Sequence, residues 1–128
     1  MGADVKILIV IPKTLKALTT VLGALDSSER RGLLYEDREV FHVAGKTYAK
    51  DWILLSIYTY YRYYGDGYET ASWPAIKVLL EKLRRQLKGV AESIIYADDI
   101  RNDGCKVTPQ MLREYTKSYK AWRKNNPI

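Results

Sequence analysis

The stretch VKILIVI at positions 5–11 decides the fold of this 128-residue chain. All of its residues except Lys6 are apolar, and all of the apolar ones except Leu8 are β-branched. A continuous run of this kind predicts a β-strand that is buried on both faces. Pro12 ends the strand, because proline has no backbone N–H to donate to a sheet. We therefore expect a central strand that other parts of the chain cover on both sides.

Leucines at helical spacing follow this strand directly. They predict an amphipathic helix over residues 13–26, with a polar turn at 27–32 after it. A short hairpin is expected next, with strands at 33–35 and 39–43. The leucines that define the helix are Leu15, Leu18, Leu22 and Leu25.

The middle of the chain is predicted to be helical. Residues 48–64 are apolar on more than one helical face, which is typical of a central helix packed by several neighbours. Thr47 is its expected N-cap after a turn at 44–46, and Gly65 is its expected end. A clean leucine stripe then predicts an amphipathic helix over residues 74–89.

The C-terminal part holds a second hairpin pattern and a last helix. Strands are predicted at 93–97 and 105–107, joined by the turn Asn102-Asp103-Gly104. Thr108 is expected to cap the last helix, with Pro109 at its first position. No internal repeat and no Ser/Gly linker divides the sequence.

This order of elements favours an α+β fold over an alternating α/β fold, because the strands come partly as hairpins. We expect a single compact domain over residues 1–128, with a small sheet and hairpins packed against about four helices. Apolar residues make up 47% and charged residues 28% of the chain, which is typical of a soluble globular protein. A disordered tail, a collagen-like fibre and a disulfide scaffold are excluded.

The sequence offers few groups for metal or redox chemistry. Cys105 is the one cysteine and His42 the one histidine. A structural zinc site needs about four such ligands, so no metal and no cofactor is expected. Since no apolar run approaches the ~20 residues of a membrane helix, no membrane partner is expected. The cysteine usage allows a reducing compartment, and we expect a cytoplasmic protein.

Positive charge is concentrated in two of the expected helices. The chain carries 21 basic and 15 acidic residues, a net charge of +6. Residues 76–90 hold five basic residues against one acidic, and residues 105–128 hold six against one. If the two helices are neighbours, these side chains form one cationic surface, which attracts phosphate backbones. The ordinary alternative is a pair of solvated helix faces. The candidate nucleic-acid-binding residues are Lys77, Arg84, Arg85, Lys88, Arg113, Lys117, Lys120 and Lys124.

Tyrosine is unusually frequent, with eleven Tyr against one Phe. Six tyrosines form a cluster at 58–68, and on a helix those at 58–64 would point in all directions, so some would leave the core. Exposed tyrosines beside Arg62 could stack on bases or anchor a protein partner. The alternative is a rim of core residues whose hydroxyls reach water. The candidate interface residues are Tyr60, Tyr61, Tyr63, Tyr64 and Tyr68.

The tetrapeptide Tyr96-Ala97-Asp98-Asp99 resembles the Tyr-x-Asp-Asp signature of reverse transcriptases, in which paired aspartates at a hairpin hold magnesium. The resemblance covers four residues, and the chain is too short to contain a polymerase palm and fingers. A polar hairpin turn is the simpler interpretation. What remains is the hypothesis that Asp98, Asp99 and Asp103 bind a single divalent cation.

Other catalytic patterns fail on spacing or partners. Gly45-Lys46-Thr47 could end a phosphate-binding loop, but such a loop needs a glycine where Val40 stands. His42 and Cys105 have no identifiable catalytic partners in the sequence. No catalytic residues are therefore assigned.

Three classes of function stay open. The first is a non-catalytic binding protein that presents the two basic helices to nucleic acid, and it uses both unusual features of the sequence. The second is a small protein–protein interaction module, such as an inhibitor, an immunity-type protein or an assembly subunit, that meets an acidic partner or a further copy of itself. The third is a metal-dependent phosphodiesterase-like enzyme built on Asp98, Asp99 and Asp103. We favour binding over catalysis, with nucleic acid ahead of protein.

Overall fold

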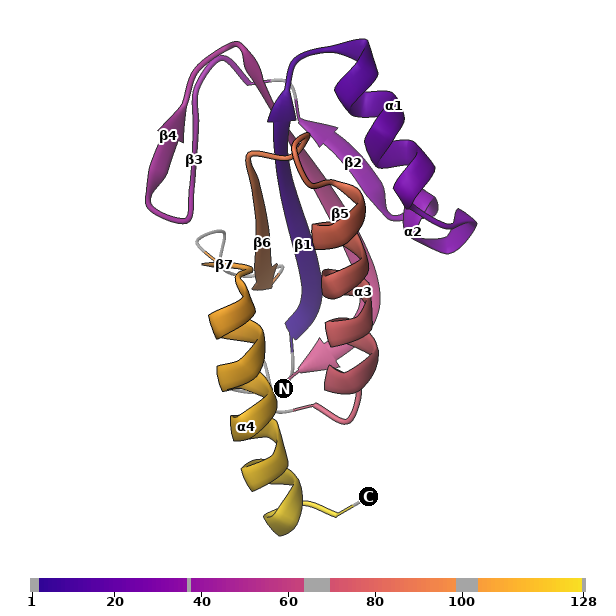
Figure 1. The fold of residues 1–128 in the computed structure, drawn as a ribbon, viewed down its shortest axis with the longest axis vertical. Helices are drawn as coiled ribbons and strands as arrows, with labels where there is room; N and C mark the ends of the chain where they lie inside the picture. The colour runs from indigo at the N-terminus through magenta and orange to yellow at the C-terminus, as the bar shows by residue number, and fades with distance from the viewer. Residues whose placement is uncertain (1–2, 37, 64–69, 99–103, 128) are drawn as a thin grey trace.

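A computed structural model of the chain describes residues 3–36, 38–63, 70–98 and 104–127. For residues 3, 60, 62, 63 and 98 it describes the backbone alone. The fold is α+β, as the sequence predicts, and Figure 1 shows a twisted sheet with helices packed across it.

The sheet has five antiparallel strands in the order β2-β5-β1-β6-β7. The central strand β1 pairs with β5 on one side and with β6 on the other. No residue from Val5 to Ile11 is more than 5% exposed, which confirms the predicted buried strand. The bounds of the strands are β1 Ala3–Pro12, β2 Leu33–Glu36, β5 Trp52–Tyr63, β6 Ser93–Asp98 and β7 Cys105–Lys106.

The two faces of the sheet are covered by different elements. Ile7, Ile9 and Ile11 point to the face on which α1, α3 and α4 pack. Leu8 and Val10 point to the other face, which is covered by the hairpin of β3 (Phe41–Val43) and β4 (Lys46–Tyr48). The four helices are α1 Leu15–Ala24, α2 Ser27–Arg31, α3 Trp73–Gln86 and α4 Pro109–Asn125.

The connectivity interlocks two β-α-β units. β1 leads through α1 and α2 to β2, and β5 leads through α3 to β6, while β5 lies between β1 and β2. This is the split β-α-β topology, also called ferredoxin-like. The β3–β4 hairpin is inserted between the two units, and β7 and α4 are added at the end. The topology itself does not assign a function, because one fold hosts many activities.

The helix predicted over residues 48–64 is wrong, because Trp52–Tyr63 forms β5. This strand is covered on both faces, with Ile53 and Leu55 toward the helices and Leu54 toward the hairpin. A strand buried on both faces is apolar at nearly every position, and a fully buried helix shows the same composition. Pairing with the central strand decides between the two.

The predicted hairpin of 33–35 with 39–43 is also wrong in its pairing. Both segments contain strands, but β2 pairs with β5, and β3 pairs with β4. The β3–β4 turn falls at Ala44 and Gly45, whose φ angles of 48° and 77° match the two-residue turns typical of hairpins. The segment predicted as a polar turn at 27–32 holds the short helix α2.

The remaining predicted elements are confirmed to within a few residues: the helices over 13–26, 74–89 and after Thr108, and the strands at 93–97 and 105–107. The side chain of Thr108 accepts a hydrogen bond from the backbone N–H of Met111, as an N-cap does. Among the described residues, no helix combines the length and apolar character that crossing a membrane requires.

Candidate nucleic-acid interface

The last helix, α4, is fixed to the fold by its N-terminal half. Met111 and Leu112 are buried in the core beneath the sheet's helical face. The indole Nε1 of Trp73, at the start of α3, donates a hydrogen bond of 3.3 Å to Oγ1 of Thr116. The ring of Tyr115 lies 5.4 Å from the Trp73 ring, between centroids. These contacts determine which side of α4 faces the core and which faces solvent.

The solvent side of α4 carries a regular stripe of cations. Arg113, Lys117, Lys120 and Lys124 are spaced by four, three and four residues, which places them along one side of an α-helix. All four are exposed, and none makes an ion pair with a described residue. We call these four residues the α4 stripe. Glu114 is the one acidic residue of the helix, and it is hydrogen-bonded to Gln110 rather than to a cation.

The basic residues of α3 are placed differently. The two helices contact each other and run in opposite directions, with their N-terminal halves side by side (Figure 1). Their C-terminal ends therefore point toward opposite ends of the molecule. Lys77 lies on the half of α3 beside α4, whereas Arg84, Arg85 and Lys88 lie toward its far end. The structure thus places four of the eight candidate residues in the α4 stripe. Three others, Arg84, Arg85 and Lys88, lie away from the C-terminal end of that stripe.

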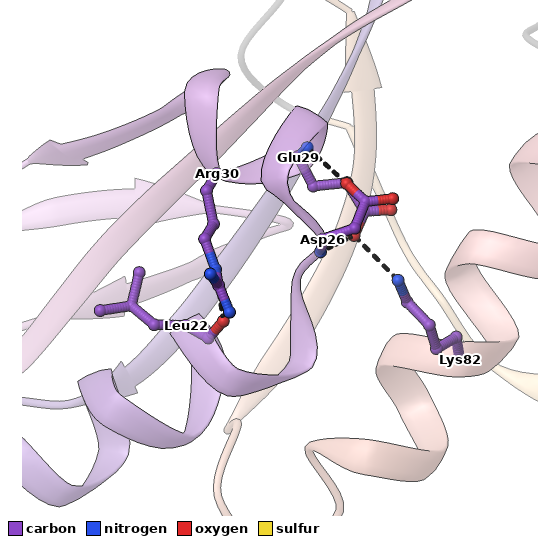
Figure 2. A network of polar contacts seen from close by, with 5 residues as sticks. All are labelled: Leu22, Asp26, Glu29, Arg30 and Lys82. Carbon is purple, nitrogen blue, oxygen red and sulfur yellow. Dashed lines mark hydrogen bonds and ion pairs between the residues drawn. The ribbon is translucent and has the colours of Figure 1, made fainter.

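Lys82, a further basic residue of α3, is neutralised by an acidic partner. Its Nζ donates to Oε1 of Glu29 at 2.8 Å, and the two side chains are 25% and 15% exposed (Figure 2). The same Oε1 accepts from the backbone N–H of Asp26 at 2.9 Å, while Asp26 accepts from the backbone N–H of Glu29 at 2.7 Å. This capping box starts α2, and the ion pair ties α2 to α3. The positive charge of Lys82 is therefore neutralised by an ion pair within the fold.

A cleft that the sequence does not predict lies beside this ion pair. It has a volume of about 520 Å³ and lies between α2, β5 and α3. Its walls come from three separate segments, so no local pattern in the sequence could reveal it. The side chains at its floor and rim include Ile57, Tyr58, Tyr61, Val78 and Lys82. Among the described lining residues the one cation, Lys82, is paired with Glu29, so these residues offer no free positive charge of the kind found on the α4 stripe.

The predicted tyrosine interface is only partly described. Tyr61 is partly buried and packs against the core. The side chains of Tyr60 and Tyr63, and residues 64 and 68 as a whole, lie outside the described residues. The interface role of Tyr60, Tyr63, Tyr64 and Tyr68 therefore stays a prediction. Of the two cluster tyrosines whose side chains the structure describes, Tyr58 is exposed, at 39%, and its ring lies 5.5 Å from Nζ of Lys6.

The cation hypothesis built on Asp98, Asp99 and Asp103 also stays a prediction. The side chain of Asp98 and residues 99 and 103 lie outside the part of the chain that the structure describes. Within the described ranges, no three or more His, Cys, Asp or Glu side chains come together to hold a metal ion.

His42 and Cys105, the two potential catalytic groups, occupy separate parts of the fold. His42 is exposed on β3, with Nδ1 2.8 Å from Oγ1 of Thr47. Cys105 is half-buried on β7, where burial raises the pKa of its thiol above the usual 9.0. The hydroxyl of Tyr115 donates a weak hydrogen bond to its Sγ at 3.7 Å, which lowers the pKa but does not offset burial. A thiol that stays protonated at neutral pH is a poor nucleophile.

Comparison with known proteins finds no match among family models, curated proteins or solved structures. The functional argument therefore depends on the residues of this chain.

Proposed function

We propose that the chain is a non-catalytic nucleic-acid-binding protein that holds phosphates on the α4 stripe. The observation that carries this proposal is the row of four exposed cations, without an ion pair to any described residue, along one side of a helix. Unpaired surface cations release the counterions of a polyanion when they bind it, and this is the main source of sequence-independent affinity.

The dimensions of the stripe suit a phosphate backbone. Arg113 and Lys124 are eleven residues apart, which corresponds to about 16 Å along a helix. Along the axis of a duplex, that length spans about five base-pair steps of 3.4 Å each. Four cations over this length can contact several neighbouring phosphates of one strand.

The helix dipole explains the cations in the last turn of α4 but not those nearer its N-terminus. Cations in the last turn of a helix are stabilised by its dipole, and this accounts for Arg123 and Lys124. The effect falls off within the last turn, so it does not account for Arg113 and Lys117. A surface that only needs to be soluble would also mix the two signs of charge more evenly, whereas α4 carries five basic residues against one acidic residue, Glu114.

Matched charge reversals on the two helices test the proposal. We expect Lys117→Glu with Lys120→Glu, on α4, to weaken binding of a labelled oligonucleotide by at least about tenfold at moderate salt. Arg85→Glu with Lys88→Glu, at the far end of α3 and in the turn just after it, changes the net charge equally and should weaken binding by less than about threefold. Fluorescence anisotropy with single-stranded and duplex oligonucleotides measures both, and circular dichroism checks the fold.

Two results would overturn the proposal. One is a wild-type protein that binds neither form of oligonucleotide at low salt. The other is an equal loss of binding in the α3 and α4 variants, which would assign the affinity to net charge alone. Stoichiometric co-purification with an acidic protein from nuclease-treated host extract, together with the first result, would favour the protein–protein module instead.

A further inference from the structure

A shallow hollow of about 420 Å³ lies at the C-terminal end of α4. Three of its lining residues are basic, one is a tyrosine and one is a proline. No carboxylate of a described residue lines it. The lining residues are Tyr119, Lys120, Arg123, Lys124 and Pro127.

The hollow is built by a hydrogen-bonded turn that follows the helix. The backbone N–H of Asn126 donates to the carbonyl oxygen of Arg123 at 3.2 Å, and its side-chain amide donates to that of Trp122 at 2.8 Å. The guanidinium of Arg123 donates in return to the carbonyl oxygen of Asn126 at 3.0 Å. These bonds fold the chain back so that Pro127 becomes a wall, and they hold the Arg123 side chain in place.

The aromatic wall lies where the helix leaves the body of the protein. Tyr119 is the last residue of α4 that packs against the core within the described ranges, and the helix continues past the end of the sheet (Figure 1). The ring of Trp122 lies 6.0 Å from the Tyr119 ring and is tilted by 40°, which supports Tyr119 from the side. An aromatic pair on a projecting helix has apolar surface that the core does not fully use.

We infer that this hollow binds one nucleotide of a single-stranded nucleic acid, with the base against Tyr119 and a neighbouring phosphate on Lys120, Arg123 and Lys124. The inference rests on the proposed function and specifies its ligand. Lys120 and Lys124 belong to both the hollow and the α4 stripe, so a strand seated in the hollow continues directly along the stripe.

The chemistry of the hollow selects a single strand over a duplex. An aromatic ring can stack on a base only when the face of that base is free, and in a duplex both faces are covered by neighbouring base pairs. An acidic peptide would satisfy the cations but would leave the aromatic wall without a planar partner. Stacking is tolerant of sequence, so we expect little base preference.

Substitution of the aromatic wall tests the inference. Tyr119→Leu keeps apolar contact with the core but removes the ring, and we expect it to weaken binding of a single strand about tenfold. Tyr119→Phe keeps the ring and should stay within about twofold of the wild type. Binding of a duplex of the same length should be equal in all three proteins. DNA and RNA strands are compared in parallel, and a preference for either supports the inference.

Tryptophan emission gives a second measurement that needs no change at Tyr119. Trp73 is 1% exposed, and Trp52 lies against Tyr48 beside the hairpin, so quenching by a bound strand should come from Trp122. We expect a single strand to quench the wild type, and Trp122→Phe to remove that quenching while still binding.

The failures of the two proposals can be told apart. If the duplex binds as tightly as the single strand and Tyr119→Leu equals the wild type, the hollow is not a base site, although α4 still binds nucleic acid. Binding of a single strand without quenching leads to the same conclusion. A free mononucleotide that binds as tightly as the strand would assign the hollow to a small ligand instead. If nothing binds, both proposals fail.

Discussion

The indole N–H of Trp73 and the hydroxyl of Thr116 join the start of α3 to the middle of α4 at 3.3 Å. Trp73 is 1% exposed, so its N–H has no access to water and depends on this acceptor. The hydroxyl of Thr116 in turn donates to the carbonyl oxygen of Leu112 at 2.7 Å, which uses its one proton. This two-bond chain fixes the rotation of α4 and hence the direction in which the α4 stripe faces.

Removal of the Thr116 hydroxyl should destabilise the fold. Thr116→Val keeps the shape of the side chain but leaves the buried N–H of Trp73 without a partner, which costs about 1–3 kcal/mol of unfolding free energy. Urea unfolding followed by circular dichroism measures the loss. Thr20→Val is the matched control, because the Thr20 hydroxyl donates to the carbonyl oxygen of Lys16 on an exposed part of α1 and makes no other side-chain bond to a described residue. Equal losses in both variants would show that the contact with Trp73 contributes nothing.

A side chain at position 32 should disrupt the pairing of β2 with β5 at the edge of the sheet. Gly32 lies against the backbone of Tyr58, whose N–H donates to the Gly32 carbonyl oxygen at 2.8 Å, and a Cβ would overlap the Tyr58 carbonyl oxygen. Since backbone cannot move aside cheaply, we expect Gly32→Ala to cost about 2–3 kcal/mol. Gly23→Ala is the control in α1, where a Cβ meets open space, and it should stabilise by about 0.5–1 kcal/mol. A neutral Gly32→Ala in thermal unfolding would contradict this packing.

The Cys105 thiol should react slowly in the native protein. Burial raises its pKa above 9.0, so less thiolate is present at any pH below that value than in the unfolded chain. Because the native state holds the thiol proton more tightly, its contribution to stability is present below pH 9.0 and is lost as the pH rises through the native pKa. Alkylation rates against pH, in buffer and in urea, measure both states. A native inflection at or below the inflection measured in urea would contradict the structural account of this site.

Elements with local signals could be predicted from the sequence, and pairing between distant segments could not. The apolar run at 5–11 and the Thr108-Pro109 cap each specify their element within a few residues. The segment that forms β5 lacks such a signal. Like β1 it is buried on both faces and shows no alternation, but it has fewer β-branched residues and no proline to end it. Its identity is decided by pairing with β1, some fifty residues away.

The candidate site divides in the same way. The placement of the α4 stripe along one side of a helix follows from helical spacing alone, whereas its binding role stays a prediction. The neutralisation of Lys82 by Glu29 joins residues 53 positions apart and has no local pattern. The hollow depends on the turn at Asn126 that brings Pro127 back to the helix. No pattern of residues in the sequence predicts this hollow.

The salt dependence of nucleic-acid binding tests the central claim most directly. If four cations of α4 each contact a phosphate, the logarithm of the association constant for a single strand should fall with the logarithm of salt concentration with a slope of about −3. Arg113→Gln with Lys117→Gln should reduce the magnitude of that slope by about 1.4, since two phosphate contacts are lost. Lys16→Gln with Lys50→Gln, which removes the same charge from α1 and the β4–β5 connection, should leave the slope unchanged. A slope near zero for the wild type, or equal slopes for the two variants, would contradict binding by the α4 stripe.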